Sequence, residues 1–236
     1  MRTFIIGDIH GCCGALEEML DLQQPDAQED QLILLGDLFD RGRESWEVFQ
    51  VVQELAEVFG ERFVLLLGNH EDYLLRDKLT MSEKMIWQRV GRKDTVRSFK
   101  AHGAKMESSI PWLKAHCVPW WRGEVDGTGR VLQCAHAAVM VEPIELNDRH
   151  TLIHDHDETL RNAYAGPLTV TGHIALQDPV WFAGDERNTK RLTAGAWQEL
   201  PAQGILCIDT GCGKGGKLTG MMVEDGHFRL ESVPEA

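Results

Sequence analysis

The chain has 236 residues and six cysteines, but no two cysteines have the C-x-x-C spacing. A chain of this length buries enough apolar surface to fold without a disulfide framework, which excludes a small disulfide-stapled scaffold. We therefore expect reduced, buried or half-buried thiols in a cytoplasmic protein. The cysteines are Cys12, Cys13, Cys117, Cys134, Cys207 and Cys212.

Long hydrophobic runs are also missing. No stretch reaches the roughly 18 continuous apolar residues that a membrane-spanning helix needs. The chain passes from Met1-Arg2 directly into a predicted strand, with no visible signal peptide. We expect a soluble, cytoplasmic protein without a membrane partner.

Positive charge is scarce. Lys and Arg total 24 against 37 Asp and Glu, which gives a formal net charge of -13. Such a surface repels a phosphate backbone, so nucleic acid is not an expected partner. A small phosphorylated substrate stays possible, because bound cations reverse the sign of the field inside a site.

No linker rich in Gly, Pro or Ser and no internal repeat interrupts the chain, so we expect one domain over residues 1–236. The first third alternates strands at 3–7, 31–35 and 62–67 with helices at 13–22 and 44–59. This alternation predicts parallel strands with right-handed crossovers. Residues 71–116 are helical and more polar, and we expect them to form a cap-like insertion.

From about residue 117 the pattern changes to short strands. Asp225-Gly226 is a hairpin turn signal between the last two. Residues 142–166 are polar and irregular, with one weak helix candidate at 156–163. We expect an α/β (α+β) fold in which two packed sheets carry helices on the outside. The predicted strands are 118–121, 130–135, 168–171, 180–182, 204–208, 218–223 and 227–232.

Three apolar runs in the first third end in similar polar motifs: GDIHG at 7–11, GDLFDRG at 36–42 and GNHE at 68–71. Ligands bind beyond the carboxyl ends of parallel strands, which is where these motifs lie. Two later histidines also follow apolar runs. Carboxylates, imidazoles and an amide in this mixture suit two cations such as Mn, Fe or Zn. The candidate ligands are Asp8, His10, Asp37, Asn69, His136 and His173.

The three motifs resemble the signature of the calcineurin-like metallophosphoesterases. The Asp-Arg-Gly and His-Glu forms resemble the branch that holds the Ser/Thr phosphoprotein phosphatases and the symmetrical diadenosine tetraphosphatases. Residues 208–219, IDTGCGKGGKLT, are similar to the tail segment of that branch. The resemblance implies a four-layer fold of two packed mixed sheets flanked by helices.

The resemblance also implies roles. Asp8 and His10 bind one metal, Asp37 bridges both, and the remaining three candidates bind the second, most simply as two Mn ions. A hydroxide between the metals attacks phosphorus.

Among the catalytic residues, the resemblance implies that His70 protonates the leaving oxygen, that Asp40 orients the His70 ring, and that Arg41 grips the phosphate. Arg161 is the best candidate for a second phosphate-binding arginine; its alternative is an ordinary helix-surface residue.

The chain departs from the family pattern at two motifs. Residues 136–138 read His-Ala-Ala where His-Gly-Gly is usual, and residues 172–174 read Gly-His-Ile where Gly-His-Thr is usual. Neither change removes a ligand. The histidines at 150, 154 and 156 fit a solvated loop near the substrate entrance better than a further metal site.

We expect a phosphomonoesterase acting on phosphoserine, phosphothreonine and phosphotyrosine in proteins, or on another small phosphoester. The alternative is a symmetrical diadenosine tetraphosphatase or other nucleotide phosphohydrolase, which breaks a phosphoanhydride with the same residues. A third hypothesis is a binding module that kept the fold and lost catalysis, and the full set of ligands together with His70 argues against it.

Overall fold

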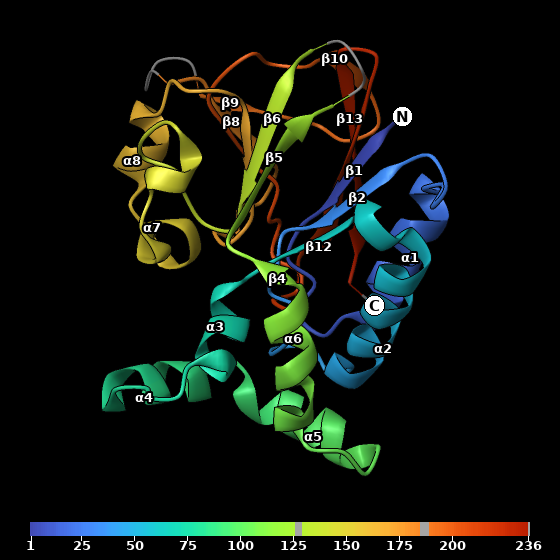
Figure 1. Cartoon of the computed structure of the whole chain (residues 1–236), viewed down its shortest axis with the longest axis vertical. Coiled ribbons are helices and arrows are strands. Elements are labelled where there is room, and N and C mark those ends of the chain that lie inside the picture. The colour runs from blue at the N-terminus through green and yellow to red at the C-terminus, as the bar shows by residue number, and fades with distance from the viewer. Residues whose placement is uncertain (126–128, 185–188, 236) are drawn as a thin grey trace.

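The computed structural model describes residues 1–125, 129–184 and 189–235. Two β-sheets lie against each other, and helices cover the outer face of each (Figure 1). The predicted four-layer α/β architecture is therefore confirmed.

The first sheet has seven strands in the order β10-β13-β12-β1-β2-β3-β4. Its four strands from the first half of the chain are parallel, as the alternation of strands and helices predicts. The long hairpin β12–β13 and the edge strand β10 complete it in antiparallel pairing. The bounds are β1 Thr3–Ile6, β2 Gln31–Leu34, β3 Phe63–Leu66, β4 Cys117–Val118, β10 Trp197–Glu199, β12 Lys217–Glu224 and β13 His227–Pro234.

The second sheet has six strands in the order β5-β6-β7-β11-β8-β9. Its central pairs, β6–β7 and β7–β11, are parallel, and the outer pairs are antiparallel. The bounds are β5 Trp120–Glu124, β6 Val131–Ala135, β7 Thr169–Thr171, β8 Val180–Phe182, β9 Lys190–Arg191 and β11 Ile205–Cys207.

Successive side chains of a strand point to opposite faces of the sheet, so each central strand contributes to two hydrophobic clusters. In β1, Ile5 faces the second sheet and packs in one cluster with Val170 and Leu206. Phe4 and Ile6 point to the other face, where they pack under the helices. This two-residue period follows from strand geometry, and burial on both faces explains why β1 carries apolar residues at consecutive positions 4–6.

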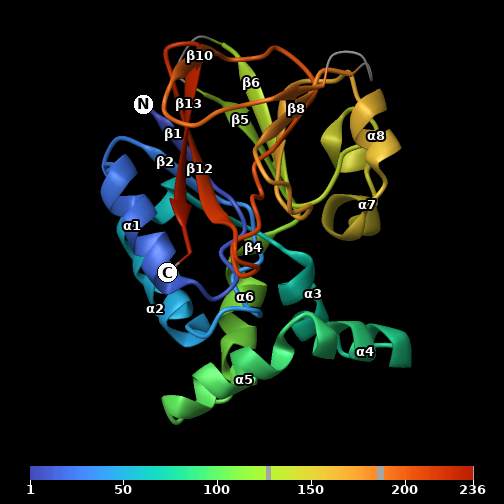
Figure 2. The same ribbon diagram turned by 180° about the vertical axis from the view of Figure 1, so that it is seen from behind.

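Helices α1 (Cys13–Gln23) and α2 (Ser45–Phe59) cover the first sheet, and α7 (Arg149–His154) and α8 (Glu158–Ala163) cover the second (Figure 2). The predicted helix at 44–59 buries Val48, Val52 and Phe59, as its spacing indicates. Each of the first two predicted helices agrees with the structure to within one residue at either end.

Four further helices lie beyond the ends of the parallel strands, at the bottom of Figure 1. They confirm that residues 71–116 are mainly helical, and they bury Trp87 and Phe99. Their action as a cap, and the single-domain organisation over 1–236, stay predictions. The helices are α3 Asn69–Leu75, α4 Met81–Arg89, α5 Arg92–Ala101 and α6 Ile110–His116.

Two edge strands and one helix were not predicted. Strands β9 and β10 are two and three residues long and largely exposed, so they carry no apolar alternation. Helix α7 lies in the segment that we expected to be irregular. It begins at a cap, where the Asp148 side chain accepts a hydrogen bond from the Thr151 N–H.

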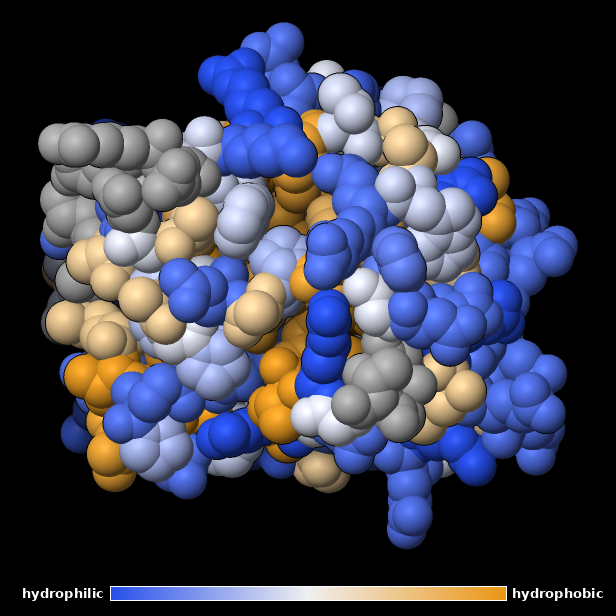
Figure 3. All heavy atoms as spheres, turned by 90° about the horizontal axis from the view of Figure 1, so that it is seen from above, coloured by the Kyte–Doolittle hydropathy of each residue, from blue (hydrophilic) through white to orange (hydrophobic). Residues whose placement is uncertain are grey.

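The end of the molecule opposite the four helices is mainly hydrophilic, with hydrophobic residues visible only in patches (Figure 3). Across residues 1–125, 129–184 and 189–235, each helix is too short or too polar to pass through a lipid bilayer.

Candidate metal centre

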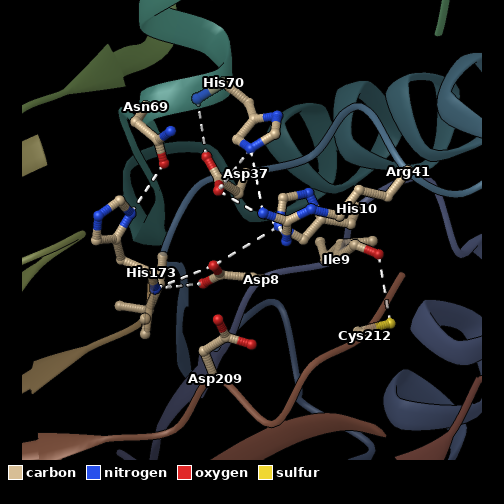
Figure 4. Close-up of polar contacts among 12 residues, drawn as sticks. Asp8, Ile9, His10, Asp37, Arg41, Asn69, His70, His173, Asp209 and Cys212 are labelled. Carbon is tan, nitrogen blue, oxygen red and sulfur yellow. Dashed lines mark hydrogen bonds and ion pairs between the residues drawn. The ribbon is translucent and has the colours of Figure 1, made fainter. Parts of the chain in front are cut away.

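Polar residues that follow five different strands meet at one place, and Figure 4 labels those that follow β1, β2, β3 and β7. Asp8 and His10 follow β1, Asp37 follows β2, and Asn69 begins α3 directly after β3. From the second sheet, His136 follows β6 and His173 follows β7. All six side chains are buried. The structure thus brings together every metal ligand predicted from the sequence.

Asp37 lies at the centre of two groups of potential ligands. One group is His10, Asp37 and His70, and the other is Asp37, His136 and His173. Within each group the candidate ligand atoms lie within 4.8 Å of one another. A carboxylate shared by two such groups is the arrangement that a pair of neighbouring cations requires.

Individual distances support this division. Asp37 Oδ2 lies 3.4 Å from His10 Nε2, and Asp37 Oδ1 lies 3.4 Å from His136 Nε2. Asp8 Oδ2 is 3.9 Å from His10 Nε2, on the first side. Asn69 Oδ1 lies 3.1 Å from His136 Nε2 and 2.9 Å from His173 Nδ1, on the second side.

Backbone carbonyls orient two of the imidazoles. His10 Nδ1 lies 2.9 Å from the Phe39 carbonyl, and His136 Nδ1 lies 2.8 Å from the Leu35 carbonyl. These contacts assign the proton of each ring to Nδ1, which leaves the lone pair of Nε2 free for a cation between the ring and Asp37. Such outer hydrogen bonds are typical of metal-binding histidines.

The electrostatics of the cluster fit cations. Burial raises the pKa of Asp8 well above its ordinary value, and the neighbouring Asp209 and Asp37 carboxylates raise it further. Burial also lowers the pKa of His10 and of His173, which keeps both rings in the neutral form that binds a metal. Among the described residues, the buried atoms His173 Nε2 and Asp209 Oδ2 have no hydrogen-bond partner.

The pKa of Asp37 shifts in the opposite direction to that of Asp8. Burial acts to raise the pKa of Asp37, but the facing imidazoles of His136, His70 and His10 outweigh it and hold this pKa below its ordinary value. Asp37 is therefore ionised and able to serve two cations at once. The donor set of the whole site, oxygens and imidazole nitrogens, fits two divalent ions.

The loop after β2 needs unusual backbone conformations to deliver its side chains. Asp37, Asp40 and Arg41 have positive φ values of 50°, 71° and 68°. Gly68 passes so close that a Cβ there would lie 2.2 Å from Asp37 N and Oδ1, so no other residue fits. Residues held in this sparsely populated region are typical of functional sites.

Glu71 holds the backbone of this loop in place, although its motif did not lead us to expect that role. The buried Glu71 carboxylate accepts hydrogen bonds from the backbone N–H groups of Asp37, Leu38 and Phe39 at 2.8, 2.9 and 3.2 Å. Burial, together with the nearby Asp37, raises the pKa of Glu71 to about 8. An acid directly after His70 in the third motif was the available signal.

Asp209 was also missed as a site residue. It follows β11 and lies beside Asp8 at the lower edge of Figure 4. Its position after the apolar run 205–208 repeats the pattern of Asp8 after β1, and that repetition could have identified it.

His70 and Asp40 form a buried pair at the edge of the centre. His70 Nδ1 lies 2.7 Å from Asp40 Oδ2, which directs His70 Nε2 toward Asp37 Oδ2 at 3.8 Å. Burial acts to lower the pKa of His70, but Asp37 and Asp40 outweigh it and raise this pKa above its ordinary value. Trp87 and Thr95 each donate a hydrogen bond to Asp40, at 2.8 and 2.6 Å. Helices α4 and α5 therefore help to position the pair.

The two arginines take different positions. Arg41 reaches into the centre, with its guanidinium in contact with His10 Nε2 and 3.4 Å from His70 Nε2. Arg161 is 2% exposed, so the alternative of an ordinary helix-surface residue is wrong. Its guanidinium donates hydrogen bonds to the carbonyls of Ala137, Asp155 and Asp157.

The histidines at 150, 154 and 156 were expected in a solvated loop, but His150 and His154 lie in helix α7. His150 and His156 are exposed, and the His156 ring stacks on His173 at 4.2 Å between centroids. His154 is half-buried instead and contacts Asp72 at 2.7 Å. The glycine-dense turn at 211–216 lies beside the site, since a Cβ on Gly213 would lie 2.7 Å from His10 Cβ.

Comparison with known sequences finds a matching family model and relatives that align over nearly their whole length. A family model described as calcineurin-like phosphoesterase matches residues 1–199. A protein of Nitrosospira multiformis named symmetrical bis(5'-nucleosyl)-tetraphosphatase is 26% identical, over 95% of this chain and 94% of its own length. A protein of the same name from Aliivibrio fischeri is 26% identical over the full length of both chains.

Comparison with solved structures supports the fold. A metallophosphoesterase from Sphaerobacter thermophilus has a TM-score of 0.65 and 15% identity, covering 100% of this chain and 90% of that one. A cold-active protein-tyrosine phosphatase of a psychrophilic Shewanella has a TM-score of 0.59 and 16% identity, covering 98% and 80%. At such identities the likeness concerns the fold alone.

Proposed function

Because this chain belongs to the calcineurin-like phosphoesterase family, and is thus a hydrolase of phosphoric esters, we propose that it splits dinucleoside tetraphosphates symmetrically. The observation that carries the chemistry is Asp37, shared by two groups of buried ligands. The observation that carries the substrate is a set of relatives with this activity in their name that match almost end to end.

Asp8, His10 and Asp37 would hold one divalent cation, and Asp37, Asn69, His136 and His173 would hold the other. The cations supply, when bound, an activated water and positive charge that neutralises the phosphate oxygens. We propose manganese as the native metal, with iron or zinc as alternatives, since the mixed oxygen and imidazole donors suit borderline cations.

The protein's own residues do the rest. Arg41 lies at the centre of the site, and its planar fork binds two phosphate oxygens. His70 Nε2 faces the same space and gives its proton to the leaving oxygen. Asp40 fixes the orientation of the His70 ring through the contact of 2.7 Å and favours its protonated form.

Arg161 has a less direct part in this proposal. It lies close enough to His173 to lower the pKa of that ring. Three backbone carbonyls already accept hydrogen bonds from its guanidinium, which has five N–H groups. We propose that Arg161 adds positive charge on the His173 side, and a direct phosphate contact stays a prediction.

The preference for phosphoproteins expected from the sequence is less well supported than its alternative. The relatives that match nearly end to end carry the tetraphosphatase name, whereas the protein phosphatases resemble this chain in fold alone. We also propose a cytoplasmic location, since all six cysteines are free thiols, as a reducing compartment favours.

A product assay tests the proposal. Manganese-loaded protein is incubated in parallel with diadenosine tetraphosphate and with phosphoserine and phosphothreonine peptides. Addition of one water to the central bridge gives two molecules of ADP, so ADP is the expected sole nucleotide product. AMP together with ATP, or faster turnover of the peptides, would refute it. Failure to hydrolyse any of these, p-nitrophenyl phosphate included, would instead favour the binding-module hypothesis.

A further inference from the structure

A second cluster of metal-binding side chains lies beside the centre and shares no residue with it. Cys12, Cys212 and Glu235 come from three distant segments, namely the turn after β1, the glycine-dense turn after β11, and the chain after β13. Their candidate ligand atoms, two sulfurs and a carboxylate oxygen, all lie within 4.8 Å of one another. Figure 4 places Cys212 beside the Ile9 carbonyl, across the picture from Asn69 and His173.

The carboxylate in this cluster has an oxygen without a partner. Glu235 Oε1 accepts a hydrogen bond from the Gly215 N–H at 2.7 Å, which orients the group. Glu235 Oε2 is buried and has no hydrogen-bond partner among the described residues. A buried polar atom in this position costs free energy unless something positive or a donor faces it.

The two thiols have only weak partners, and they also form a sulfur–sulfur hydrogen bond with each other. Cys212 Sγ lies 3.4 Å from the Ile9 carbonyl, and Cys12 Sγ lies 3.6 Å from the His10 carbonyl. Both are free thiols, with Cys212 buried and Cys12 partly exposed. Neither contact is strong enough to explain why two sulfurs and a carboxylate oxygen are gathered in one place.

We propose that Cys12, Cys212 and Glu235 form a binding site for a thiophilic divalent cation such as Zn²⁺. Two thiolates and one carboxylate are three of the four ligands of a tetrahedral zinc site. A cavity of about 500 Å³, lined in part by Cys12, Arg41 and Glu235, lies beside the cluster and would give water, as a fourth ligand, and the ion a path. Binding releases the two thiol protons to solvent.

Ligand chemistry separates this site from the catalytic one. Soft sulfur ligands select zinc and similar ions, whereas the oxygen and imidazole donors around Asp37 accept manganese. The ion would join the turn at 211–216 to the segment that carries Asp8 and His10. Gly213 already packs there, since its Cβ would lie 2.7 Å from His10 Cβ and 3.0 Å from Arg41 Cβ.

Cobalt is a suitable probe, because thiolate ligation of Co²⁺ gives an intense near-ultraviolet charge-transfer band that oxygen and imidazole ligands do not give. Fully reduced protein, preloaded with manganese, is titrated with Co²⁺ and then with Zn²⁺. We expect the band to appear with Co²⁺ and to disappear as Zn²⁺ displaces it. We expect Cys12→Ser and Cys212→Ser to abolish it and the matched control Cys13→Ser to retain it.

The Glu235→Gln variant keeps both sulfurs. Glu235 is more exposed than Cys212, so this variant remains informative if Cys212→Ser fails to fold. It should retain the band and bind Co²⁺ at least about 10-fold to 100-fold less tightly, since even loss of a partner behind a ligand costs that much and Glu235 is a ligand itself. A band of equal strength and affinity in Cys12→Ser and Glu235→Gln would overturn the proposal.

Absence of the band in reduced wild-type protein would also overturn it. If non-reducing peptide mapping then found Cys12 linked to Cys212, the pair would be a disulfide-forming one instead. These readouts depend on thiolate ligation alone, so they are independent of the substrate that the catalytic centre hydrolyses.

Discussion

Replacing Glu71 by Gln tests whether the loop that carries Asp37 depends on one buried carboxylate. The two carboxylate oxygens accept three backbone N–H groups, two at Oε1 and one at Oε2. A glutamine has a single amide oxygen. In its better orientation it keeps the bonds from Leu38 and Phe39, and its NH₂ group then faces the N–H of Asp37.

The loss of stability follows from the number of hydrogen bonds that glutamine cannot accept. One buried donor loses its acceptor and meets a second donor, at about 1–3 kcal/mol. For a chain of this size each kcal/mol lowers Tm by about 2–4 °C, so the expected decrease is roughly 2–12 °C. Because the lost bond is that of Asp37 itself, manganese content should fall as well.

Thermal unfolding and metal analysis of wild type and purified variant, at a pH above the Glu71 pKa of about 8 so that the carboxylate is ionised, provide the measurement. Glu61→Gln is the matched control, since Glu61 is exposed before β3 and such a surface change stays within about 0.5 kcal/mol. If Glu71→Gln matched this control in both Tm and manganese content, Glu71 would not be what holds the loop.

Three further predictions concern other residues. His70→Asn should keep both metals but slow hydrolysis of alkyl phosphates by about 10²–10⁴-fold, the usual span for loss of a general acid; an unchanged rate would remove His70 from that role. Asp37→Asn should weaken manganese loading at both positions, and full metal content by atomic absorption would contradict a shared carboxylate. Burial acts to raise the pKa of Asp30, but hydrogen bonds from Arg2 outweigh it and hold this pKa below its ordinary value of 3.8. The resulting stability is present above that value and is lost as pH falls through the folded-state pKa. Asp30→Asn should therefore flatten the decline in unfolding free energy as pH falls from about 5 through the folded-state pKa; a decline as steep as in wild type, measured by urea unfolding, would exclude this pair as its source.

The central strands and first helices were predictable because burial leaves a strong pattern. Strands β1, β2 and β3 are almost entirely apolar, with Thr3 and Gln31 the polar residues among them, and their predicted bounds agree with the structure to within one residue. Edge strands β9 and β10 were not predictable, because short exposed strands are held by backbone pairing and need no apolar side chains.

Supporting residues were harder to identify than the candidate ligands. Glu71 acts on the backbone of residues 37–39, and a backbone partner leaves no trace in the sequence of that loop. Trp87 and Thr95 position Asp40 from helices α4 and α5, about fifty positions further along the chain. Contacts at such separations depend on how the helices pack.

The sequence by itself determined which residues have metal-binding chemistry and that they follow the ends of buried strands, because residue type and apolar runs are local properties. Only the tertiary structure decided that Asp37 lies between two groups of imidazoles, since that requires the second sheet to pack against the first. It alone also placed Cys12, Cys212 and Glu235 together. Proximity between segments some two hundred residues apart arises from packing of the layers and from no local pattern.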